Sequence, residues 1–188
     1  VAAWTARVGS IELSASDRER VRGLGRDDID SFPARFPSDE SGSAAKAVLE
    51  AKENGDSLGG IAEIRVRGAP AGLGQPVFHK LKADLAAALM SVGATSAVEI
   101  GAGVEVSARS GQDFHGGSSH VYGGIRGGIS TGEEILLRVH FKPTSSLLDV
   151  AKKGRHDPFI VTRAIPVLEA MTWLVLADHK IWSLSDKL

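Results

Sequence analysis

Residues 135–141 read Ile-Leu-Leu-Arg-Val-His-Phe, and large apolar side chains occupy every second position of this segment. Alternation of this kind predicts a β-strand with one buried face, because successive side chains of a strand point to opposite sides. The apolar positions are Ile135, Leu137, Val139 and Phe141. The strand should end before Pro143, since a proline nitrogen cannot donate to a strand ladder.

Further strands and helices are predicted on either side of this segment. Residues 61–68 form another clear strand pattern, and shorter strands are expected over residues 1–13, 97–100 and 104–108. Helical spacing of apolar residues predicts helices that begin near residue 43 and residue 80. A last helix, over residues 163–182, is apolar on nearly all sides, which is typical of a helix buried on most of its surface. Pro166 is expected in its first turn.

Strands and helices follow one another without strict alternation. This order predicts an α+β protein in which helices pack against a mainly antiparallel sheet. The chain has 188 residues, of which 43% are hydrophobic, so we expect one large domain or two small ones with a real core.

The composition argues against several classes of protein. A formal net charge of −1 does not favour general binding to nucleic acid or to a membrane surface. The absence of cysteine excludes disulfide scaffolds, thiolate metal sites and cysteine catalysis, and it fits a reducing, cytoplasmic location. The longest apolar run is broken by Glu169, Thr172 and Asp178, so no membrane span is expected. The histidines lack metal-binding spacing, and no metal site is expected.

The chain begins at Val1, inside a segment that already resembles a strand. We therefore expect it to be the later part of a longer protein.

Three short loops have the chemistry of a binding site. The first, Lys142-Pro-Thr-Ser-Ser146, combines a cation with three hydroxyls and free backbone N–H groups, which is what a phosphate or another anion requires. A turn whose hydroxyls satisfy the local backbone fits the same residues equally well.

The second loop, residues 122–132, is rich in glycine. Positions without a side chain allow a ligand to lie against the backbone, although a simple hairpin would also use glycine here.

The third loop reads Lys153-Gly-Arg-His-Asp-Pro158. Asp157 precedes a proline and should be extended, so Arg155 and Asp157 share a face and His156 points away. Arg155 suits a phosphate or carboxylate, and it would keep Asp157 ionised. The alternative is an exposed ion pair at the entry to a helix.

Seven segments in this order resemble the C-terminal half of chorismate synthase, over nearly the whole chain and most firmly from Gly55 onward. They read GDSLGGIAEI, GLGQPVFHKLKADLAAALMSV, AVEIGAG, GGIRGGISTG, FKPTSS, GRHDP and RAIPVLEAMTWLVLADH. Each motif alone is weak, whereas the series is very specific.

The resemblance implies an enzyme that uses reduced FMN to convert 5-enolpyruvylshikimate 3-phosphate to chorismate. Phosphate leaves by a 1,4-anti elimination without net redox change, as a step of the shikimate pathway towards aromatic amino acids. The implied fold is a β-α-β sandwich with helices between two antiparallel sheets, and the implied assembly is a homotetramer. The flavin would be reduced by NADPH or by an outside reductase.

The resemblance also implies which residues contact FMN and which one moves a proton. The implied FMN contacts are Gly93, Ala94, Gly127, Lys142, Pro143, Thr144, Ser145, Ser146 and Arg155. Asp157 matches the family's acidic residue near the flavin, and it would help to move a proton at a ring nitrogen. Gly93 replaces the family's usual Asn or Gln, so only its backbone could serve.

The chain departs from the family pattern in three places. The N-terminal half, with its two histidines, its Arg/Ser-rich segment and most of its phosphate-binding arginines, is absent. Loops near residues 110–122 and 146–153 are shorter than usual, which favours omitted loop segments over a divergent chain. A non-catalytic fragment or paralogue that keeps a flavin or anion pocket is the alternative. A nucleotide-binding module is disfavoured, because no Walker or dinucleotide fingerprint is present.

Overall fold

The computed structural model describes residues 1–117, 119–145 and 157–185. Its centre is an antiparallel five-stranded sheet with the order β2-β1-β3-β7-β4. The strands are β1 (Ala2–Val8), β2 (Ile11–Glu12), β3 (Gly60–Val66), β4 (Thr95–Ile100) and β7 (Ile135–Phe141). The strand predicted at residues 135–141 lies between β3 and β4, with Ile64 opposite Leu137 on one side and Val98 opposite Val139 on the other.

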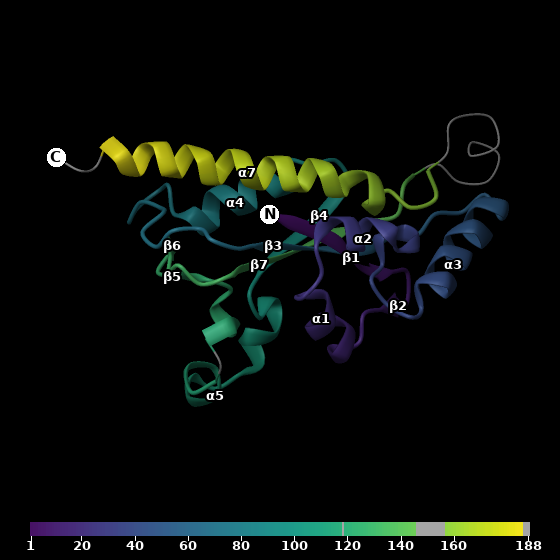
Figure 1. Cartoon of the computed structure of the whole chain (residues 1–188), viewed down its shortest axis with the longest axis horizontal. Coiled ribbons are helices and arrows are strands. Elements are labelled where there is room, and N and C mark those ends of the chain that lie inside the picture. Colours follow the sequence, from purple (N-terminus) through teal and green to yellow (C-terminus); the bar gives the residue numbers. More distant parts are fainter. Residues whose placement is uncertain (118, 146–156, 186–188) are drawn as a thin grey trace.

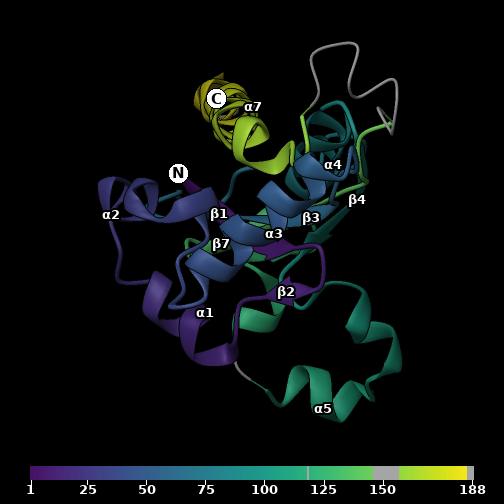
Figure 2. The ribbon, with the colours of Figure 1, turned by 90° about the vertical axis from the view of Figure 1, so that its right-hand side faces the viewer.

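Three longer helices complete the hydrophobic core. They are α3 (Ser41–Glu53), α4 (Leu81–Met90) and α7 (Val161–Ser185). Both ribbon views place α4 and α7 side by side on one face of the sheet (Figures 1 and 2). Leu85 of α4 and Leu168 of α7 are fully buried together with the alternate residues Ile64, Leu137 and Val139 of the sheet. The apolar face predicted from period-2 alternation is therefore the face that the helices cover.

Short elements lie on the opposite face or at the sheet margins. These are α1 (Ala15–Val21), α2 (Arg26–Ser31), η1 (Pro33–Arg35), η2 (Gly103–Ala108), α5 (Gly111–His115), η3 (Ser119–Tyr122), β5 (Ile125–Arg126) and β6 (Ile129–Ser130). In both views, α1 and α5 lie on the side of the sheet away from α7 (Figures 1 and 2).

The predicted α+β class is confirmed, whereas three local predictions were wrong. Residues 104–108 lie in the 3₁₀ helix η2 rather than in a strand. Residues 1–13 form two strands of a hairpin instead of one. α7 begins at Val161, two residues earlier than expected, so Pro166 lies beyond the first turn, inside the helix.

Within the part of the chain that the structure describes, no helix combines the length and the apolar character needed to span a bilayer.

Candidate functional site

A groove of about 610 Å³ runs between the C-terminal end of α4 and the N-terminal half of α7. It is lined by Ser91, Val92, Gly93, Asp157, Ile160, Arg163, Ala164, Val167 and Met171. Two of these, Gly93 and Asp157, belong to the set predicted from the sequence. The volume is typical of a pocket for a small organic ligand or cofactor.

The turn after α4 holds Gly93 and Ala94 at the groove. Ser91 ends the helix, and the Thr95 N–H donates to the Val92 carbonyl at 3.2 Å to close the turn. Ala94 has a φ of 67°, in the left-handed region that residues with a Cβ rarely adopt. Its carbonyl accepts a hydrogen bond from the Lys142 N–H at 3.0 Å. This bond joins the turn to the start of the Lys142–Ser145 segment.

Side-chain and backbone hydrogen bonds connect the Lys142–Ser145 segment to two other loops. The Thr144 hydroxyl donates to the Asp157 carbonyl at 3.0 Å, and the Ser57 hydroxyl donates to the Thr144 carbonyl at 2.8 Å. The Leu58 N–H donates to the Pro158 carbonyl at 2.8 Å. Three segments that are distant in sequence are thus fixed beside one another.

Both carboxylate oxygens of Asp157 are occupied. Oδ1 accepts from the Phe159 N–H at 3.1 Å, and Oδ2 forms an ion pair with Nε of Arg163 at 3.1 Å. The sequence analysis paired Asp157 with Arg155 instead. Arg155 lies outside the described residues, and Arg163 is the cation that contacts Asp157 in the described part of the chain.

Arg163 was not predicted as a site residue, although its position in the sequence indicates that it needs an acidic partner. It is the third residue of α7, where the helix dipole disfavours a cation and favours an anion. A basic residue in a first turn therefore needs a nearby carboxylate, and Asp157 lies just upstream. This reasoning would have found the pair.

The remaining predicted FMN contacts are residues 142–145, Ser146 and Gly127. Lys142, Pro143, Thr144 and Ser145 lie together on the segment that bonds to Ala94 and Asp157. The exposed Lys142 side chain has no hydrogen bond or ion pair with another described residue. Ser146 lies outside the described residues, so nothing tests its predicted role.

Gly127 is not brought to the groove within this chain. It occupies the turn between β5 and β6, with a φ of 61°, and the Leu81 N–H at the start of α4 donates to the neighbouring Gly128 carbonyl at 2.7 Å. Gly93 follows the other end of the same helix. A ten-residue helix is about 15 Å long at 1.5 Å per residue, so α4 separates Gly127 from the groove.

The groove has one apolar wall and one polar end. The wall consists of Val92, Ile160, Ala164, Val167 and Met171, and the polar end consists of Asp157 and Arg163. An apolar wall suits a flat aromatic ring, and an exposed guanidinium suits an anionic group on the same ligand.

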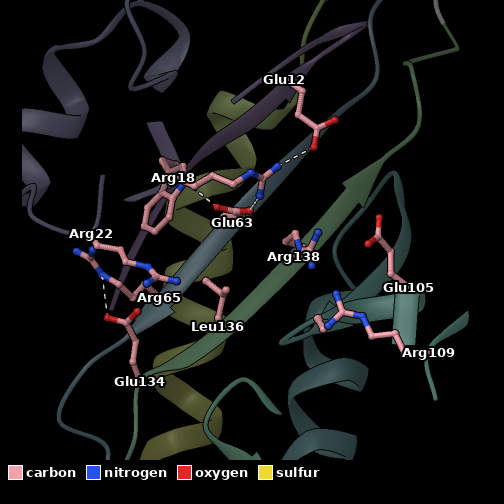
Figure 3. A pocket seen from close by; sticks show the side chains of 12 residues that line it. Glu12, Arg18, Arg22, Glu63, Arg65, Glu105, Arg109, Glu134, Leu136 and Arg138 are labelled. Carbon is pink, nitrogen blue, oxygen red and sulfur yellow. Dashed lines mark hydrogen bonds and ion pairs between the residues drawn. The ribbon is translucent and has the colours of Figure 1, made fainter. Parts of the chain in front are cut away.

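A second cavity, of about 370 Å³, lies on the opposite face of the sheet (Figure 3). None of the predicted site residues lines it. Arg18 pairs there with Glu12 and with the buried Glu63, and Arg65 lies 3.7 Å from Glu134.

The arginines of this second cavity are surrounded by both signs of charge. Burial lowers the pKa of Arg18, Glu12 partly offsets that effect, and the nearby Arg138 lowers the pKa further. Arg138 itself pairs with Glu99 at 3.4 Å. The groove is the stronger candidate because Gly93 and Asp157, which were predicted from the sequence, line it, whereas no predicted site residue lines this cavity.

Comparison with known proteins identifies the family of the chain. The family model for chorismate synthase matches residues 1–181. The chain belongs to the chorismate synthase family. A chorismate synthase from Bdellovibrio bacteriovorus is 59% identical over 188 residues, which are 100% of this chain and 54% of that protein. One from Methanosarcina mazei is 43% identical over 84% of this chain and 50% of its own length.

A crystal structure of chorismate synthase has the same fold. It superposes with a TM-score of 0.82 at 27% sequence identity, over 97% of this chain and 57% of that one. The chain therefore spans about half the length of the chorismate synthases that it matches.

Proposed function

We propose that this chain forms the C-terminal half of an active chorismate synthase, a carbon–oxygen lyase that converts 5-enolpyruvylshikimate 3-phosphate to chorismate with reduced FMN. One observation supports this most directly. Gly93 and Asp157 come from distant parts of the chain and line one groove, and hydrogen bonds to Ala94 and Asp157 hold the Lys142–Ser145 segment beside these residues.

The groove fits a flavin in size and in chemistry. Val92, Ile160 and Met171 offer an apolar surface to the ring system, and a thioether next to an aromatic ring is a favourable contact. The exposed Lys142 ammonium and the exposed backbone of the same segment would hold a phosphate or an anionic ring. When bound, reduced FMN supplies the electron-rich ring beside which the phosphate leaves the substrate.

The chain's own residues supply orientation, charge and a place for a proton. Lys142 is a point charge that would stabilise developing negative charge on the ligand. The Asp157 carboxylate accepts one backbone hydrogen bond and forms one ion pair, yet a carboxylate has about four lone-pair positions. Asp157 thus keeps acceptor capacity for a proton at a flavin ring nitrogen, the role that the resemblance implies.

An anaerobic assay tests the proposal. The protein that contains this chain is mixed with FMN, a chemical reductant and 5-enolpyruvylshikimate 3-phosphate, and chorismate is followed by its ultraviolet absorbance. We expect turnover that requires all three components. A folded protein that binds FMN but forms no chorismate would instead be the non-catalytic paralogue.

A further inference from the structure

Arg163 is the most exposed charged group at the groove. Its side chain is 68% exposed, and its Nε atom lies 3.1 Å from Asp157 Oδ2 in an ion pair. Its two terminal nitrogens form no hydrogen bond or ion pair with any of the described residues. The ion pair at Nε therefore orients the guanidinium, and its terminal nitrogens remain available to a ligand.

The local geometry indicates that orienting Arg163 is one task of Asp157. The Phe159 N–H holds Oδ1 at 3.1 Å, so the carboxylate cannot rotate freely. The Thr144 hydroxyl and the Leu58 N–H fix the backbone of residues 157 and 158 from two sides. A cation at the third position of a helix is disfavoured by the helix dipole, and the fixed carboxylate offsets this cost.

The surroundings of Arg163 favour a charged partner from a ligand. Ile160, just before α7, and Ala164, in the first turn of the helix, are apolar neighbours in the groove lining. Charge-assisted hydrogen bonds are stronger next to apolar surface than in open water. The planar fork of an arginine binds two oxygens of a carboxylate or phosphate at once.

We propose that Arg163 binds the anionic oxygens of the ligand in this groove, with Asp157 as its positioning residue. This assignment rests on the proposed function for the identity of the ligand. Under that function, the oxygens belong either to FMN or to 5-enolpyruvylshikimate 3-phosphate, and the two sources are separated by titrating each compound alone.

The test uses the full protein that contains this chain. FMN and 5-enolpyruvylshikimate 3-phosphate are titrated separately by calorimetry into the wild type, Arg163→Gln and Arg163→Lys. Because a hydrogen bond to a charged group contributes about 1.5–3 kcal/mol, Arg163→Gln should weaken binding of one ligand about 10- to 100-fold. Arg163→Lys should recover only part of the loss, since the fork is missing. Lys46→Gln is the control, because Lys46 forms an exposed pair with Glu50 on α3 and lines neither cavity.

Asp157 variants test the positioning role. Asp157→Ala should weaken the same ligand as Arg163→Gln does, while Asp157→Asn keeps one acceptor oxygen and should weaken it less. Equal affinities of wild type and Arg163→Gln for both ligands would overturn the proposal, provided that thermal unfolding shows both proteins folded.

Failure of the proposed function has a different signature. A wild type that binds neither FMN nor the substrate refutes that function, and inorganic phosphate and pyruvate then test Arg163 directly. The Nε–H resonance of Arg163, identified by its loss in Arg163→Gln, should shift on addition of phosphate or pyruvate. Absence of any shift refutes the anion site itself.

Discussion

The resemblance implies an amide side chain at the position of Gly93, and the structure has room for one. No heavy atom lies within 4 Å of a Cβ built at this position, and its φ is outside the left-handed region. Gly93→Asn should therefore fold normally and add one hydrogen bond to the flavin. A net contribution of about 0.5–1.5 kcal/mol predicts an FMN affinity roughly 2- to 12-fold higher. Calorimetry of both proteins measures the change, with Gly42→Asn on α3 as a control whose affinity for FMN should not change.

Gly60 is required for the close approach of β3, β1 and the loop after Asp157. A Cβ at Gly60 would collide with the Arg7 carbonyl and would lie 2.7 Å from the Phe159 ring. Gly60→Ala should cost about 1–3 kcal/mol in the free energy of unfolding, the usual range for overpacking. Gly42→Ala, at an open site in α3, should be neutral or stabilising by up to about 1 kcal/mol. Urea unfolding compares the two variants, and equal stabilities would contradict this account.

Single residues were predictable where a local rule applied to them. Lys142 was singled out because a cation, a proline and hydroxyls follow a strand, and Asp157 because it precedes a proline, and the role of both in binding stays a prediction. Arg163 was missed because its partner lies outside its helix, and helical periodicity describes only residues of the same helix. Gly127 was predicted but does not lie at the groove. A sequence motif cannot indicate that a helix about 15 Å long separates Gly127 from Gly93.

At the level of elements, α7 is attached to the edge of the sheet by the buried Glu169. Its Oε1 accepts the Ala3 N–H of β1 at 3.0 Å, and its Oε2 pairs with Arg26 of α2 at 2.8 Å. Glu169→Ala leaves a buried N–H without an acceptor, which costs about 1–3 kcal/mol. Arg26→Ala should cost less, because Arg26 is 57% exposed and the Ala3 bond remains. Thermal and urea unfolding measure both variants, and an equal or larger loss in Arg26→Ala would contradict this ranking.

α1 begins with a capping box whose contribution depends on pH. The Ser14 hydroxyl accepts from the Asp17 N–H at 3.1 Å, and the Asp17 carboxylate accepts from the Ser14 N–H at 3.3 Å. Burial raises the pKa of Asp17, but hydrogen bonds from Ser14 and Ser38 outweigh it, and the pKa is lowered from the ordinary 3.8. This contribution is therefore full above pH 3.8 and is lost as the pH falls through the lower folded-state value.

Ser14→Ala should accordingly cost about 1 kcal/mol at pH 7, the typical loss for a capping residue. Part of this difference should vanish in strong acid, where Asp17 is protonated in both proteins. Urea midpoints at pH 7 and at pH 2 measure it, and a larger difference at pH 2 would contradict the sign of the pKa shift.

Elements were predictable from long patterns and not from short ones. Seven alternating positions identified β7 with its exact bounds. Residues 104–108 offered only Val104 and Val106, and both valines are exposed in the 3₁₀ helix. Two apolar positions two residues apart do not distinguish a strand from a tight turn. The pattern at residues 104–108 was therefore too short to predict a strand.

At the scale of the whole molecule, α7 has a second apolar stripe that the sheet does not cover. Ile165, Leu168 and Leu176 are buried towards the core. Val167, Leu174 and Ile181 recur every seven residues and are 47%, 65% and 69% exposed. The sequence predicted a helix buried on most sides, and the sandwich implied by the resemblance would bury this stripe beneath a second layer. A contiguous exposed apolar patch on one helix is otherwise unusual for a monomeric protein.

The exposed stripe predicts that the 188-residue chain, when it is produced alone, will self-associate. Exposed residues repeating at a seven-residue spacing favour association with another apolar surface, so the chain should associate as its concentration rises. Leu174→Glu combined with Ile181→Glu should keep it monomeric and leave the free energy of unfolding of the monomer within about 0.5 kcal/mol, because neither side chain is in the core. Leu49→Glu, at a 58% exposed position on α3, serves as the control and should not prevent association. Analytical ultracentrifugation over a range of concentrations measures the masses, and a wild-type chain that stays monomeric throughout would show that the stripe needs no covering layer.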